Sequence, residues 1–151
     1  MSLNIFSINI NGFRSKRKQL YIKNFLNDNN VDILCIQETF IEEFRTAKKV
    51  ENLLNLHAKL IWSFGDENSK GVLIILNNKD IHIEQYHIDM VGRLVYVDFN
   101  IFNKMSYRLI NVYCPNDCNE RNGFLSDMVP YLVAARQLIL VGDFNFFLNT
   151  N

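Results

Sequence analysis

The chain has 151 residues, 48% of them hydrophobic and 21% charged, which is the size and composition of one folded domain. This composition excludes a disordered, collagen-like or linker protein. Sixteen basic residues balance sixteen acidic ones, so the net charge does not indicate a nucleic-acid-binding protein. No apolar run approaches the ~18 residues of a membrane helix, and no basic stretch precedes an apolar one at the N-terminus.

The three cysteines are an odd number in a chain without an export signal. This usage predicts free thiols and a nuclear or cytoplasmic location, not a secreted protein. Cys35 lies in an apolar run and is predicted to be a small core residue. Cys114 and Cys118 are followed by no Cys or His pair at zinc spacing, so we expect no metal role for them.

The first half of the chain alternates between strand-like and helix-like patterns. Residues 3–10 predict a strand with alternating faces, and Ser15 is predicted to cap a helix that runs to about Asn27. The nearly continuous apolar run at residues 31–37 is typical of a strand buried on both faces. Residues 42–56 predict a second helix, and His57 directly after them lies in the same helix-like stretch.

The second half is richer in strands. Strands are predicted at residues 60–64, 71–76, 81–88, 92–101, 107–114 and 137–142, with residues 102–104 as the turn of a hairpin. A third helix is predicted at residues 119–132, where Pro130 should end or kink it. Seven or eight strands with three helices predict an α/β domain built on mixed sheets.

Polar side chains follow several of these predicted strands. They are Asn9, Asn11, Glu38, Asn116, Asp143 and Asn145. If the strands are neighbours, these carboxylates and amides meet at one end of the sheets, where open α/β sheets bind ligands. Carboxylate and amide oxygens suit a hard cation such as Mg²⁺, which also serves phosphate chemistry.

Each of these residues also has a simpler interpretation. Glu38 can belong to a solvated turn, and Asn11 with Gly12 is a common turn pair. Asp143 and Asn145 can hydrogen-bond the local backbone, and Tyr113 lies in an apolar strand that favours a core position. The ordered set, more than any single residue, favours a functional site.

Five short motifs in order resemble the endonuclease/exonuclease/phosphatase superfamily. They are NINGFR at residues 9–14, IQET at 36–39, GR at 92–93, NVYCPN at 111–116 and GDFN at 142–145. The first and last of them are most similar to the apurinic-endonuclease-like domain of non-LTR (LINE-like) retrotransposons. The resemblance implies a four-layered α/β sandwich of two mixed sheets flanked by helices.

The resemblance also implies roles for individual residues. Glu38 would be the main Mg²⁺ ligand (Mn²⁺ being an alternative ion), with Asn11 and Asn9 beside it. Asp143 would orient or deprotonate the attacking water or assist the leaving oxygen, and Asn145 would hold Asp143 and the phosphate. Tyr113 and Asn116 would donate hydrogen bonds to phosphate oxygens. The implied reaction nicks a DNA strand by hydrolysing a phosphodiester.

The family pattern continues beyond the GDFN motif to another aspartate and a Ser-Asp-His motif, which this sequence lacks. We therefore expect residues 1–151 to be the N-terminal two-thirds of the domain, incomplete at the C-terminus and inactive alone. In a parent polyprotein a reverse transcriptase region would accompany it. His57, His82 and His87 are expected to be surface or core histidines and not substitutes for the missing one.

A basic cluster at residues 14–18 is the only visible feature for DNA binding. Arg14 and Lys16 begin a predicted helix, where the helix dipole disfavours cations and an external phosphate would relieve the repulsion. A solvated turn or a nuclear-import-like cluster explains it equally well. Three functions stay open: a retrotransposon endonuclease, another superfamily member such as an apurinic repair endonuclease or phosphoesterase, and a non-catalytic remnant.

Overall fold

The computed structural model describes residues 2–101 and 105–146, and these form eight strands and three helices, as the sequence predicts. In chain order they are β1 (Ile5–Asn9), α1 (Lys16–Asp28), β2 (Ile33–Gln37), α2 (Phe44–Leu54), β3 (Lys59–Ser63), β4 (Val72–Leu76), β5 (Ile81–Ile88), β6 (Leu94–Ile101), β7 (Met105–Tyr113), α3 (Cys118–Leu132) and β8 (Gln137–Asp143). None of these helices is long and apolar enough to cross a membrane.

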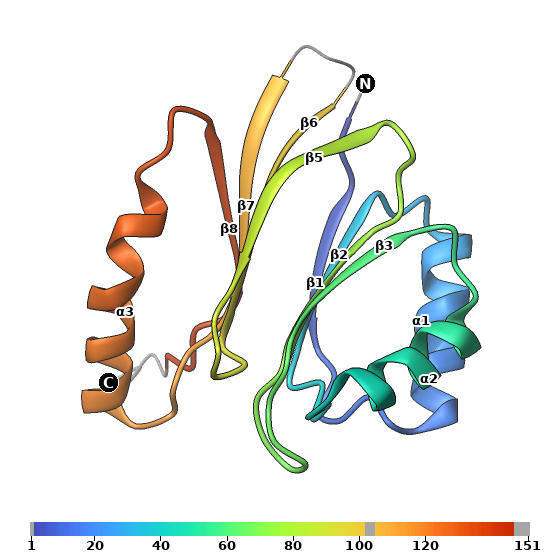
Figure 1. Cartoon of the computed structure of the whole chain (residues 1–151), viewed down its shortest axis with the longest axis horizontal. Coiled ribbons are helices and arrows are strands. Elements are labelled where there is room, and N and C mark those ends of the chain that lie inside the picture. The colour runs from blue at the N-terminus through green and yellow to red at the C-terminus, as the bar shows by residue number, and fades with distance from the viewer. Residues whose placement is uncertain (1, 102–104, 147–151) are drawn as a thin grey trace, which may run out of the picture.

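The strands form two four-stranded mixed sheets. The first has the order β1-β2-β4-β3, in which only β1 and β2 are parallel. The second has the order β5-β6-β7-β8, in which only β7 and β8 are parallel. The sheets face each other, with α1 and α2 outside the first and α3 outside the second (Figure 1). The predicted four-layered α/β sandwich is confirmed.

Strand β2 shows why this layering follows from the sequence. All five of its residues are buried. Leu34 and Ile36 pack under α1 and α2, whereas Ile33 and Cys35 face the second sheet. An apolar run without alternation is stable only where both faces are covered, so the prediction for this strand is confirmed. Burial also raises the pKa of the Cys35 thiol well above its usual range, so this cysteine is an inert core residue.

The start of α1 differs from the prediction. Ser15 occupies the N-cap position, but its side chain makes no capping hydrogen bond. Two other side chains fix this end of the helix instead. Lys18 donates its Nζ to the Ile10 carbonyl at 2.8 Å, and Gln19 donates its Nε2 to the Phe13 carbonyl at 2.7 Å. These bonds hold the loop after β1 against the helix.

The second predicted helix was too long at both ends. It runs from Phe44 to Leu54 and stops because Asn55 adopts a left-handed conformation with φ 46°. His57 therefore lies in the loop after α2, not in a helix. The third helix begins one residue earlier than predicted, because the Asp117 carboxylate caps it, and continues two residues past Pro130. The predicted hairpin turn at 102–104 lies outside the described residues, while β6 and β7 pair antiparallel as expected.

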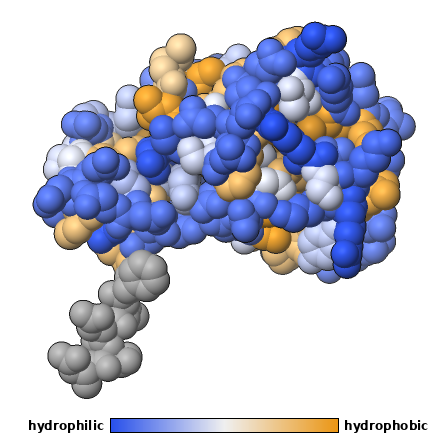
Figure 2. Space-filling view, turned by 90° about the horizontal axis from the view of Figure 1, so that it is seen from below, coloured by the Kyte–Doolittle hydropathy of each residue, from blue (hydrophilic) through white to orange (hydrophobic). Residues whose placement is uncertain are grey.

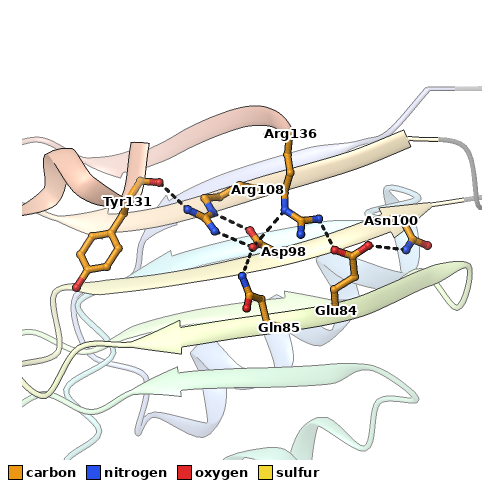
Figure 3. A network of polar contacts seen from close by, with 7 residues as sticks. All are labelled: Glu84, Gln85, Asp98, Asn100, Arg108, Tyr131 and Arg136. Carbon is orange, nitrogen blue, oxygen red and sulfur yellow. Dashed lines mark hydrogen bonds and ion pairs between the residues drawn. The ribbon is translucent and has the colours of Figure 1, made fainter. Parts of the chain in front are cut away.

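A buried ion-pair network joins three strands of the second sheet to the segment before β8 (Figure 3). The Asp98 carboxylate, which has no exposed surface, accepts two hydrogen bonds of 2.7 Å from Arg108. It also contacts Arg136 at 3.3 Å and accepts a 2.6 Å bond from Gln85. Arg136 in turn pairs with Glu84. Every bond in this network crosses between chain segments, so it fixes how they pack.

Candidate active site

The loops that follow β1, β2, β7 and β8 gather at one end of the sandwich, the lower end in Figure 1. The two edge strands β1 and β8 contact each other, although they belong to different sheets. Three predicted site residues there have left-handed backbone: Asn11 at φ 47°, Glu38 at φ 55° and Asn145 at φ 50°. Non-glycine residues rarely adopt this conformation, and it is concentrated at functional sites.

Asn9 brings the two predicted carboxylates together. Its Nδ2 donates to Glu38 Oε1 and to Asp143 Oδ2, each at 2.9 Å. Its Oδ1 accepts a 3.0 Å hydrogen bond from the Asn11 backbone. Residues from three separate motifs therefore form one cluster, and Asp143 also accepts the local backbone N–H of Asn145, as its simpler interpretation predicts.

Asp143 is held from both sides. The Asn145 backbone donates to Asp143 Oδ1 at 3.0 Å, and Asn145 Nδ2 donates to the Cys114 carbonyl at 2.6 Å. Next to it, Gly142 has φ 141°, and a Cβ there would lie 2.0 Å from the Val112 carbonyl oxygen. Only glycine permits β8 to approach β7 this closely, and the approach positions Asp143.

Tyr113 is only 7% exposed and lies beside Glu38 and Arg93. The Arg93 guanidinium stands over its ring at 5.3 Å and donates to its carbonyl at 3.2 Å. Burial and the neighbouring Glu38 carboxylate raise the pKa of Tyr113 to about 12. The phenol therefore keeps its proton at neutral pH and can donate a hydrogen bond, so Tyr113 is both a buried residue and a member of the site.

Two buried amides behind the cluster were not predicted as site residues. Gln37, directly before Glu38, donates to Asn111 Oδ1 at 2.7 Å and to Ser7 Oγ at 3.0 Å. Asn111 in turn donates to the carbonyls of Ile36 and Leu73 at 3.1 and 3.0 Å. These bonds join the two sheets directly beneath Glu38. The signal in the sequence was a polar residue within each apolar strand.

A cleft of about 520 Å³ opens at this cluster. Its lining comprises Ser7, Asn9, Gln37, Gly142, Asp143, Phe144, Asn145 and Phe146. Figure 2 views this end of the molecule and shows a mainly hydrophilic surface with scattered hydrophobic side chains. This mainly polar lining, with Asp143 as its charged side chain, differs from the mainly apolar lining of drug-sized ligand pockets.

The cluster fits a hard divalent cation. In the described part of the chain, neither Glu38 nor Asp143 forms an ion pair, although one amide nitrogen holds both. Residues 2–101 and 105–146 contain no group of three or more His, Cys, Asp or Glu side chains with metal-binding geometry. Glu38 and Asp143, two carboxylates without an ion-pair partner among the described residues, are oxygen donors of the kind that Mg²⁺ prefers.

The structure does not bring all predicted residues into the cluster. Arg14 is exposed and forms an ion pair with Glu42, so it lies outside the cluster, and its contact with DNA stays a prediction. Lys16 is exposed at the first position of α1, and Asn116 is exposed in the loop before α3. The resemblance placed Asn116 on the phosphate, and its exposed side chain has no described hydrogen bond to the cluster.

Two curated proteins are similar to this chain along nearly its whole length. One is the "Transposon TX1 uncharacterized 149 kDa protein" of Xenopus laevis, which is 26% identical over 99% of this chain and 11% of its own length. The other is an exodeoxyribonuclease of Bacillus subtilis, 22% identical over 95% of this chain and 58% of its own length. The chain therefore spans only part of each relative.

The fold is shared with solved structures at low sequence identity. The crystal structure of humanized D. rerio TDP2 superposes with a TM-score of 0.74 at 17% identity, covering 96% of this chain and 67% of that one. Residues 6–150 match the Endonuclease/Exonuclease/phosphatase family, and this span includes Asn9, Glu38, Tyr113, Asp143 and Asn145. The chain therefore belongs to the Endonuclease/Exonuclease/phosphatase family.

Proposed function

We propose that this chain is the catalytic part of a Mg²⁺-dependent DNA endonuclease that nicks target DNA for retrotransposition. The observation that carries the proposal is the Asn9-bridged pair of Glu38 and Asp143 beside the protonated phenol of Tyr113. The similarity to a transposon protein supports the retrotransposition context, and the similarity to an exodeoxyribonuclease supports DNA as the substrate.

In this proposal Glu38 and Asn11 hold the metal ion, and Asn9 sets the position of Glu38 through its amide. When bound, Mg²⁺ (or Mn²⁺) neutralises charge on the phosphate oxygens. Asp143 orients the attacking water and accepts its proton, because Asn9 and Asn145 fix both of its oxygens. Tyr113 keeps its proton and donates a hydrogen bond from its hydroxyl to a phosphate oxygen as negative charge develops. Asn116 and Lys16, both exposed, contact the flanking DNA backbone.

The proposal includes the wider protein. Residues 1–151 form the N-terminal two-thirds of the nuclease domain, with a reverse transcriptase region in the same polyprotein and a nuclear or cytoplasmic location. The partial coverage of both relatives supports a longer parent protein. An apurinic repair endonuclease or a phosphoesterase would use the same cluster, and the exodeoxyribonuclease relative favours a DNA substrate among these alternatives.

The proposal is tested by nicking of supercoiled plasmid with the protein expressed over its full reading frame. We expect conversion to the open circular form with Mg²⁺ or Mn²⁺ and none with EDTA, because the two carboxylates repel a phosphodiester unless a cation neutralises them. Glu38→Gln should require a higher Mg²⁺ concentration for half-maximal nicking. Nicking that continues in EDTA would overturn the metal-dependent mechanism. Faster hydrolysis of inositol phosphates than of DNA would show that DNA is not the substrate.

A second expected outcome concerns the phenol. Tyr113→Phe should lower kcat by about 10²-fold with little change in KM, since it removes one donor to the transition state. Because the pKa of Tyr113 is about 12, the ratio of wild-type to Tyr113→Phe activity should be constant between about pH 6 and 10. Initial rates across that range measure this ratio. A ratio that falls as the pH rises through neutrality would show that the hydroxyl proton is already lost there.

A further inference from the structure

The turn between β5 and β6 displays a methionine at the same end of the sandwich as the candidate active site. Met90 is 91% exposed, more than any other large hydrophobic side chain in the described residues. Single exposed hydrophobic residues are common on protein surfaces and need no explanation by themselves. The conformation of this turn and its place on the molecule distinguish Met90 from such residues.

The turn is anchored on both sides of Met90. The Asp89 carboxylate accepts the Arg93 backbone N–H at 3.1 Å, and the Asp89 carbonyl accepts the Ser63 hydroxyl at 2.8 Å. Gly92 has φ 72°, and its carbonyl accepts the Gly71 backbone N–H at 2.8 Å. A Cβ at Gly92 would lie 2.5 Å from the Phe64 carbonyl oxygen, so the backbones here are in close contact. The apolar tip of the turn, formed by Met90 and Val91, therefore lies between residues whose backbone positions are fixed.

Within this turn Val91 and Met90 have different surroundings. Val91 is 54% exposed and lines a hollow of about 180 Å³ together with Phe124 and Met128 of α3. It therefore helps to seat the turn against the helix. Met90 does not line that hollow and remains almost fully accessible. Of these two side chains of the tip, the methionine is the more accessible to a partner.

The turn is also close to the site. Arg93, which stacks on Tyr113, is three residues after Met90, so their Cα atoms are at most about 11 Å apart. Figure 1 shows this turn at the same end of the sandwich as the loops that carry the cluster. Successive base pairs of DNA are about 3.4 Å apart, so the separation of Met90 from Arg93 corresponds to at most about three base pairs.

We propose that Met90 inserts between stacked bases of duplex DNA close to the phosphate that is cut. This inference rests on the proposed DNA endonuclease function. Methionine is long, flexible and apolar, and side chains of this kind act as wedges that partly unstack a base step. Pyrimidine–purine steps such as TA and CA unstack most easily, so the wedge directs nicking toward them. Met90 is thus a specificity-determining residue without a hydrogen bond to any base.

The direct test measures unstacking. A duplex containing 2-aminopurine beside the cut position is titrated with the full-reading-frame protein carrying Asp143→Ala, which keeps the DNA intact. We expect a several-fold rise in fluorescence, retained with Met90→Leu and lost with Met90→Gln. Met105→Gln is the matched control, because Met105 is 44% exposed at the start of β7, the end of that strand away from Tyr113. A rise with Met90→Gln equal to that of the parent would overturn the inference.

Nicking measurements separate this inference from the proposed function. With intact Asp143, Met90→Gln should lose the preference for TA and CA steps and nick duplex DNA about tenfold more slowly. Nicking by wild type with an unchanged step preference in Met90→Gln would reject the wedge and leave the endonuclease proposal standing. Unstacking without nicking would keep the wedge and reject catalysis. A wild-type protein that neither binds nor nicks DNA would reject both.

Discussion

Asp143→Ala is expected to lower the rate of metal-dependent nicking by roughly 10³-fold, within the range for loss of a general acid–base group. Asp143 is the carboxylate with both oxygens fixed, one by the Asn9 amide and the other by the Asn145 backbone. Removing it leaves no group in the cluster with the same orientation to activate water. Because Asp143 ends β8 outside the apolar core, the melting temperature should change little.

The control for this experiment is Asp28→Ala. Asp28 is an exposed carboxylate at the last position of α1, so its removal changes the net charge equally without touching the cluster. Plasmid nicking rates of the two variants under identical Mg²⁺ concentrations measure the difference. Asp143→Asn adds a second comparison, because it keeps the side-chain shape and removes the basicity. Nicking by Asp143→Ala at the wild-type rate would reject the assignment of the general base.

Local patterns in the sequence predicted most of the elements and the position of several candidate site residues at strand ends. The apolar run of β2 required burial on two faces, and the polar residues that follow β1, β2 and β8 had to lie at strand ends. Such features depend on neighbouring residues in the chain, so a pattern reveals them. The same reasoning found Glu38 and Asp143 without knowledge of how the sheets pair.

The partners of these residues could not be predicted in this way. Asn9 and Asp143 are 134 positions apart, and their hydrogen bond depends on two sheet edges meeting in space. The pairing of Arg14 with Glu42 likewise depends on how two loops pack, and the local sequence does not reveal it. Ser15 had a good capping sequence, but tertiary bonds from Lys18 fixed that helix end instead. Long-range geometry therefore decided each of these outcomes.

Asp98→Ala is expected to lower the free energy of unfolding by about 3–5 kcal/mol, the usual effect of breaking a buried ion pair. Arg108, which is only 9% exposed, would lose both hydrogen bonds to the carboxylate. Its third bond, to the Tyr131 carbonyl at 3.1 Å, keeps the guanidinium in place so that it cannot move to water without opening the helix contact. Urea unfolding followed by circular dichroism measures the loss, which is a large fraction of a typical domain stability.

The matched control and the pH dependence distinguish a buried pair from a surface one. Glu84 also pairs with Arg136 but is exposed, so Glu84→Gln should leave the free energy of unfolding nearly unchanged.

Burial alone would raise the pKa of Asp98, but hydrogen bonds from Arg108 and Gln85 and the charges of the two arginines outweigh it and lower this pKa. A carboxyl with a lowered pKa stabilises the fold above its unfolded value of about 3.9, and this contribution is lost as the pH falls through the folded value. Wild type should therefore lose stability below about pH 4 more steeply than Asp98→Asn, and equal slopes for the two proteins would contradict a charged, buried Asp98.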